Sequence, residues 1–365
     1  MPRAPVSDAY EMALTMAATL LSFTAALFIE RAAHLHADVL VLAVVLSLSL
    51  ARAQRHADTR QRLSALVLIP VVAAGATLLG RLMSVHLAYG SAVFTVLMAV
   101  PIWIRRYGPY ATRIGTLATL PLVALLVLPR PALPPRAEGA LAGWAWSVLV
   151  GLLAAVSVWS VQGAADRFGM GGPEGVAAAP RRRRSSRLRP RPSTRMAVQM
   201  ALAVGAGFVV GKAVFGTHWP WVVFTAILVG SGNRGRRDVL RKGLERLAGA
   251  CGGTVLTAVG ATPSGVGGTP CVVLIFLVLA VALWLRPRGY AYWAAGATAA
   301  LALLYGYFGQ DAQDLLPTRL GAIVVGAALA VAAAWWVLPV RGRGSRAAGD
   351  GTPPAAPAAP VTRSA

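Results

Sequence analysis

Apolar residues gather along this chain in twelve runs, each separated from the next by a short polar segment. A helix of about 20 apolar residues crosses ~30 Å of hydrocarbon, and a shorter one crosses when flanking side chains reach towards the surface. The pattern therefore predicts an all-α polytopic membrane protein with about 12 transmembrane helices. Two runs, 39–51 and 219–230, are so short that the pattern leaves open whether they cross fully. The twelve runs occupy residues 11–29, 39–51, 63–80, 87–104, 114–128, 141–161, 196–215, 219–230, 247–261, 271–285, 290–307 and 320–340.

Two polar segments divide these runs into halves. Residues 163–195 and 341–365 hold Gly, Pro, Ser, Ala and Arg but few large apolar side chains, a composition typical of disorder. The sequence thus predicts a six-helix membrane half at 1–162, a basic disordered cytoplasmic linker at 163–195, a second six-helix half at 196–340 and a disordered cytoplasmic tail at 341–365. The chain is 56% hydrophobic and 13% charged, whereas a soluble domain carries about 25% charged residues, so a soluble enzyme is not expected.

The formal net charge of +22 would ordinarily suggest a nucleic-acid partner, but its distribution suggests a membrane topology instead. If the N-terminus lies in the cytoplasm, the inner segments hold 29 of the 35 Lys and Arg residues and carry +21, whereas the outer segments hold 6 and carry +1. Because Lys and Arg are retained on the cytoplasmic side of short loops, this asymmetry predicts an even number of spans with both termini cytoplasmic. In this count Arg319 belongs to an outer loop.

The two halves resemble each other at an offset of 184 residues. Without gaps, 11 of 52 positions are identical, and Arg52 and Arg62 align with Arg236 and Arg246. In both halves an apolar run, an outer histidine, a second run, a basic inner segment and a third run follow in the same order. Six spans return a chain to its starting side, so the pattern predicts parallel repeats related by an axis along the membrane normal.

Signals for catalysis, cofactors and metals are weak. Residues 230–235 match G-x-G-x-x-G, but another apolar run follows where a dinucleotide fold requires a βαβ unit. Cys251 and Cys271 sit in apolar runs without the paired spacing of a zinc site or a disulfide framework. No acid lies deep within a run, and no nucleophile stands beside a base. The sequence therefore predicts no enzyme, no cofactor and no metal site.

The linker arginines from Arg181 to Arg195 have three interpretations: a topology signal, a contact with anionic lipid, or a nucleic-acid site. No aromatic residue is interleaved with them, as it would be in a single-strand binder, so no nucleic-acid partner is expected. The arginines are then first a topology signal and second a contact for the anionic lipids of the bilayer. Whether the protein forms a homo-oligomer is left open.

Small residues at i, i+4 spacing occur in two of the runs. Gly207 and Gly211 lie in one run, and Gly249 and Gly253 in another. Such spacing lets helix backbones approach closely in lipid, so these glycines predict helix packing. The alternative is that they line a pathway with little side-chain bulk.

From His218 the sequence reads HWPWVVFTAILVGSGNRGRRDVLRKGLERLAGACGGTVL, and here it resembles the fusaric acid resistance-like integral membrane family. That family has an aromatic-rich start to a span, a Thr followed by apolar residues, a basic inner loop, and an Arg-x-x-Gly-Thr-x-x-Gly-like start to the next span. Ala250 stands where the family has the Thr of this last motif. The resemblance is best from 195 to 256, is moderate to 340, and covers the first half only in layout. The matching positions are His218, Trp219, Trp221, Thr225, Arg246, Gly249 and Gly253.

The resemblance implies a bacterial cytoplasmic-membrane exporter of aromatic carboxylic acids and similar toxic compounds, with distant plant relatives that conduct malate as anion channels. We therefore expect a transporter of small organic anions. Four arginines at inner helix ends would form a positive vestibule that concentrates anions, and four residues at the start of one span would line the pathway. The vestibule residues are Arg52, Arg62, Arg236 and Arg246, and the pathway residues are His218, Trp219, Trp221 and Thr225.

Other functions remain open at this stage. The arginines could serve topology alone, and the chain could be an anion channel or a membrane anchor whose basic linker binds lipid or a partner. A major-facilitator carrier shares the six-plus-six count, but its loop after the second span contains glycine, whereas residues 52–62 contain none.

Overall fold

The computed structural model describes residues 5–33, 38–54, 59–127, 140–168, 192–232, 235–260, 268–308 and 316–337. Within these residues the chain forms α-helices and short 3-10 turns, with no strand, which confirms the all-α prediction. The helices are α1 (Pro5–Ala33), α2 (Asp38–Ala53), α3 (Thr59–Val85), α4 (Leu87–Trp103), α5 (Pro109–Val127), α6 (Ala140–Arg167), α7 (Pro192–Phe215), α8 (Trp219–Gly230), α9 (Arg236–Gly260), α10 (Thr269–Leu285), α11 (Tyr290–Tyr307) and α12 (Leu316–Trp336). The 3-10 turns are η1 (Ile104–Tyr107), η2 (Gly216–His218) and η3 (Arg286–Arg288).

Eight segments of the described chain are long and apolar enough to cross a membrane, so the protein is a multi-pass membrane protein. They correspond to α1, α3, α4, α5, α6, the α7–α8 pair taken together, α10 and α12. α2 contributes a shorter apolar stretch, Val39–Ala53, and α9 and α11 are not among the eight. The count of twelve spans therefore stays a prediction.

Large apolar side chains also cover the outside of the molecule, as contact with lipid requires. On α3, Val67, Val71 and Leu78 are each more than half exposed. In a soluble protein such a stripe would be a liability, whereas in a bilayer it is the surface that faces the acyl chains.

The basic segments that the sequence analysis treats as loops are largely helical. α9 begins at Arg236, eleven residues before the predicted span, and α3 begins at Thr59. Asp238 lies in the first turn of α9, where the helix dipole favours an acid, and Arg241 Nε donates to Glu245 Oε1 at 2.8 Å one turn later. Similarly, α6 continues to Arg167, and α7 begins at Pro192, so both ends of the 163–195 segment are helical.

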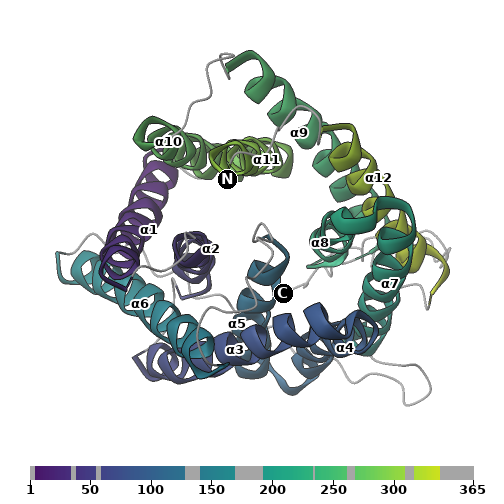
Figure 1. Cartoon of the computed structure of the whole chain (residues 1–365), viewed down its shortest axis with the longest axis horizontal. Coiled ribbons are helices and arrows are strands. Elements are labelled where there is room, and N and C mark those ends of the chain that lie inside the picture. Colours follow the sequence, from purple (N-terminus) through teal and green to yellow (C-terminus); the bar gives the residue numbers. More distant parts are fainter. Residues whose placement is uncertain are drawn as a thin grey trace, which may run out of the picture.

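The helix pairings of the first half recur six helices later. α1 packs on α2 and α6, and α7 packs on α8 and α12; α3 packs on α5 and α6, and α9 packs on α11 and α12. The halves meet in two places, through α4 with α7 and α5 with α8, and through α1 with α10. Because of these two seams the outer helices form a closed ring, with α2, α5 and α8 inside it (Figure 1). Around the ring the order is α1, α10, α11, α9, α12, α7, α4, α3 and α6.

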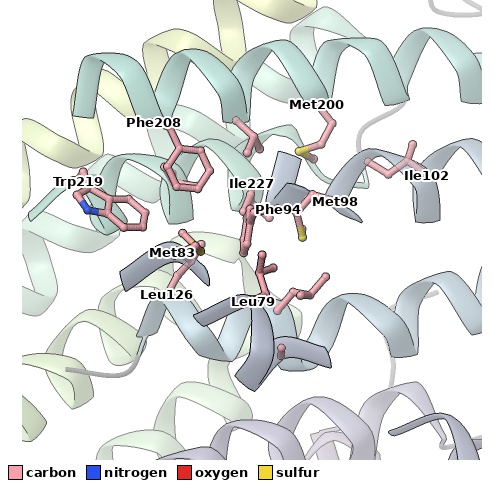
Figure 2. Close-up of a cluster of buried hydrophobic side chains, with 14 of the residues drawn as sticks. Leu79, Met83, Phe94, Met98, Ile102, Leu126, Met200, Phe208, Trp219 and Ile227 are labelled. Carbon is pink, nitrogen blue, oxygen red and sulfur yellow. The ribbon is translucent and has the colours of Figure 1, made fainter. Parts of the chain in front are cut away.

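A buried aromatic and aliphatic cluster holds the seam between α4 and α7 (Figure 2). Phe94 of α4 is fully buried, and its ring centroid lies 5.6 Å from that of Phe208 on α7 in an edge-to-face arrangement. Met83, Met98 and Met200 fill the spaces beside these rings, as the flexible thioether side chain does well. The cluster fixes α7, and through it α8, against the first half.

Candidate anion-binding site

The two tryptophans of α8 contact different neighbouring helices. Trp219 is 1% exposed and packs against Phe208 in the cluster of Figure 2. Trp221 follows two residues later, about 200° round the helix, and its ring lies 5.3 Å from that of Tyr305 on α11. Thr225, one turn beyond Trp221, shares its face and is fully buried. The structure thus brings Trp221 and Thr225 together but places Trp219 in the hydrophobic core.

Arg246 lies within the bundle of the second half. Its side chain is 1% exposed, and its Nε and Nη2 are buried without a hydrogen-bond partner in the described part of the chain. Its guanidinium carbon lies 5.9 Å from the ring centroid of Phe224 on α8. The adjacent acid, Glu245, pairs with Arg241 instead. An unpaired buried cation is costly, and such groups in membrane bundles generally mark ion or substrate paths.

Arg319 is a second buried cation, which the sequence analysis missed by assigning it to an outer loop. It lies in the first turn of α12 and is 8% exposed. Its Nη2 donates to the Thr298 carbonyl oxygen at 3.1 Å, and its guanidinium carbon lies 4.3 Å from the Trp221 ring centroid. Its Nε is buried with no partner among the described residues. Arg319 and Arg246 are close enough for their charges to repel each other.

Neutral polar groups accompany the two arginines. The hydroxyls of Thr225 and Thr298 are buried and have no hydrogen-bond partner in the regions that the structure describes. The Tyr290 hydroxyl, at the start of α11, is also buried without a hydrogen-bond partner among the described residues, and it interacts electrostatically with Arg246. Together, Arg246, Arg319, Trp221, Thr298 and Tyr305 define a cluster between α8, α9, α11 and α12, which we call the arginine site.

The other three predicted vestibule arginines do not join this site. Arg62 donates to Asp166 Oδ2 at 3.0 Å, Arg52 lies 5.0 Å from the Trp293 ring, and Arg236 lies 5.7 Å from the Trp335 ring. His218 ends the η2 turn before α8, 3.4 Å from the Thr217 hydroxyl. Each of these three arginines therefore has an acid or an aromatic ring that offsets its charge.

Glycines bring the helices of the site close together. On α9, Gly249 faces Ala294 of α11, and an added Cβ would lie 2.6 Å from the Ala294 Cβ. Gly253 faces Ala295 and Thr298 of the same helix. A Cβ on Gly326 of α12 would overlap the backbone of α8 and lie 2.9 Å from the Thr225 Cβ. Because real Cβ contacts are longer than 3.0 Å, these positions require glycine.

The predicted pair on α7 has looser surroundings. A Cβ on Gly211 would lie 3.1 Å from the Trp219 Cβ, and one on Gly207 would lie 3.5 Å from Val223, an ordinary contact. Both glycines face α8.

Lys242 lies on α9 one turn before Arg246, outside the apolar part of that helix. Its Nζ donates to the Ser231 carbonyl oxygen at 2.7 Å and lies 5.3 Å from the Tyr290 ring. Burial lowers the pKa of Lys242 to about 8, because the ammonium loses hydration.

In the described part of the chain, no three His, Cys, Asp or Glu residues come together as a metal site would require. Residues 181–191 of the linker lie outside the described residues.

Ionisable side chains inside a helical membrane bundle are the usual mark of a functional site. Residues 193–333, which include the whole arginine site, match the model of the family described as fusaric acid resistance protein-like. The matched region contains residues 195–256, where the sequence resembles this family best. Among curated proteins and solved structures, none matches the chain.

Proposed function

We propose that this protein is a transporter that moves small organic anions, such as aromatic carboxylates, outward across a bacterial cytoplasmic membrane. The observation that carries the proposal is Arg246, an unpaired cation that is 1% exposed inside the family-matched half. A carboxylate would supply the missing partner, because it accepts two hydrogen bonds from one guanidinium. Aromatic side chains beside Arg246 and Arg319, namely Phe224, Trp221 and Tyr305, suit a flat ring attached to that carboxylate.

A buried guanidinium without a counter-charge destabilises the protein by several kcal/mol, and an anion that binds there offsets this cost. Transport also requires that the anion is released, so the site binds it through only a few contacts. The buried hydroxyls of Thr225 and Thr298 offer it weak donors along the way.

The architecture that we propose for this transporter is two parallel six-helix repeats with twelve spans and both termini in the cytoplasm. The recurrence of the helix pairings six helices later supports the repeats. The excess of Lys and Arg in segments on one side supports the orientation. Within the repeats, Arg62 and Arg246 are equivalent positions, yet Arg62 is paired with Asp166. The anion path would therefore belong to the second half.

The test is efflux of radiolabelled benzoate from proteoliposomes that contain purified protein. Replacing Arg246 with Gln removes the cation and keeps a polar side chain of similar length. A charge-assisted hydrogen bond contributes about 1.5–3 kcal/mol, so we expect the KM for benzoate to rise by roughly 10- to 150-fold, or transport to disappear.

The matched control is Arg62→Gln, the equivalent position in the first half, where Asp166 already neutralises the charge. We expect this variant to keep its transport within about a factor of three, since an exposed ion pair contributes at most about 1 kcal/mol. Equal loss in both variants, or undiminished transport in Arg246→Gln protein of normal stability, would refute the proposed site.

A further inference from the structure

Arg319 gives the arginine site a second positive charge. Arg246 and Arg319 come from different helices, α9 and α12, and both are more than nine-tenths buried. Neither has an acidic partner among the described residues, and each repels the other. A monocarboxylate neutralises only one of them. The residual charge would stay buried and uncompensated while the substrate is bound.

The guanidinium of Arg319 is held in a fixed orientation. Its Nη2 is bonded to the Thr298 carbonyl oxygen, and its plane rests near the Trp221 ring, which in turn contacts Tyr305. Its buried Nε is left as a donor that no described residue uses. A cation held on two sides with a free donor is preorganised to receive an anionic group, because little side-chain entropy is lost on binding.

Among the described residues of the first half, the matching arginine is paired with an acid. Arg62 has Asp166 as its partner, and Arg52 shares the Trp293 ring with Arg286, whose guanidinium carbon lies 5.4 Å from that ring's centroid. Arg246 and Arg319, which are buried without an acidic partner among the described residues, thus both lie in the family-matched half.

We propose that Arg319 is a specificity-determining residue which binds a second anionic group, so that the preferred substrates are aromatic compounds with two negative charges, such as dicarboxylates. The inference rests on the proposed function, since it assigns a substrate class to the same site. One carboxylate binds Arg246, the other binds Arg319, and the ring between them lies among Phe224, Trp221 and Tyr305.

The experiment measures how strongly three related ligands inhibit the uptake of radiolabelled benzoate into proteoliposomes. The ligands are benzoate, benzene-1,4-dicarboxylate and 4-carbamoylbenzoate. The last is isosteric with the dicarboxylate but carries one charge fewer. For the wild-type protein we expect the inhibition constant of the dicarboxylate to be at least tenfold lower than that of 4-carbamoylbenzoate. In Arg319→Gln we expect this ratio to fall below about two, because the variant lacks the second positive charge.

Arg319→Lys separates charge from structure, because it keeps the positive charge but loses the planar fork. We expect it to retain a ratio of roughly three to five in favour of the dicarboxylate. A wild-type ratio near one overturns the inference, and so does an unchanged ratio in Arg319→Gln. An equal loss for all three ligands also overturns it, since that result indicates a structural role only. If the wild-type protein does not transport benzoate, the proposed function fails; if it transports benzoate without charge preference, only the present inference fails.

Discussion

The close contact between α9 and α11 offers a test of how the site is positioned. Replacing Gly249 with Ala would place a Cβ 2.6 Å from the Ala294 Cβ and 2.9 Å from the Ala295 nitrogen. Ordinary contact between carbon atoms is about 3.5–4.0 Å, so α9 and α11 must separate by roughly 1 Å. Backbone atoms cannot rotate aside, and overpacking of this kind typically costs about 1–3 kcal/mol.

Gly252 on the same helix is the matched control. A Cβ there meets nothing within 4 Å, so Gly252→Ala should gain up to about 1 kcal/mol from helix propensity. The assay is thermal unfolding of the purified variants in detergent, followed by size-exclusion fluorescence. We expect Gly249→Ala to unfold at a lower temperature than the wild type and Gly252→Ala at the same or a higher one. Because Arg246 lies one turn before Gly249, Gly249→Ala should also weaken benzoate transport. Equal unfolding temperatures for the two variants would refute the packing argument.

Three further predictions concern residues around the site. Trp219→Ala should destabilise the protein by about 3–5 kcal/mol because its side chain fills the core, whereas Trp221→Ala should chiefly reduce transport. Thermal unfolding and benzoate efflux are measured on both variants, and an equal loss of stability and transport in each would contradict this prediction. Asp166→Asn should lower stability by less than about 1 kcal/mol, because its carboxylate is 58% exposed and screened by solvent, and a larger drop in melting temperature would speak against this. The pKa of Lys242 is lowered to about 8 in the folded protein, so the unfolded chain binds the Lys242 proton more tightly. The melting temperature should therefore rise between about pH 8 and 10, and this rise should be smaller in Lys242→Gln.

Apolar run length was sufficient to predict the helices, because a segment in lipid must satisfy its backbone internally and has few alternatives to a helix. Each predicted run overlaps a described helix. The extent of α9 was less predictable. Its first 11 residues are mostly charged, and the charge-counting argument treats such residues as loop, whereas Asp238 and the Arg241–Glu245 pair favour helix there.

The site was predicted in part. Arg246, Trp221 and Thr225 come from the stretch that resembles the family. Trp221 and Thr225 share a face of α8, and Arg246 lies against Phe224 of the same helix. Trp219 and Trp221 are equally aromatic in sequence. Their spacing of two residues places them on different faces, but only the packing of α7 decides which one enters the core.

Arg319 was missed because its side chain folds back from the end of α12 into the bundle. Counting charges by segment assigns every Arg near a helix end to a loop. A signal was available, since Arg319 directly precedes an apolar run and has no acid within four residues on either side that could pair with it. The interaction with Trp221 of α8, about 100 residues earlier in the chain, could only be found from the fold.

The most direct test of the central claim, that the arginine site binds organic anions, is to locate a bound anion. Crystals grown with 4-iodobenzoate would show the iodine position by anomalous scattering. We predict one site per chain in the second half, with the carboxylate in contact with Arg246 and the ring beside Phe224 or Trp221, and no such site in crystals of the Arg246→Gln variant. An iodine peak at the Arg62–Asp166 pair or at the seam between the halves, with none at Arg246, would contradict the account.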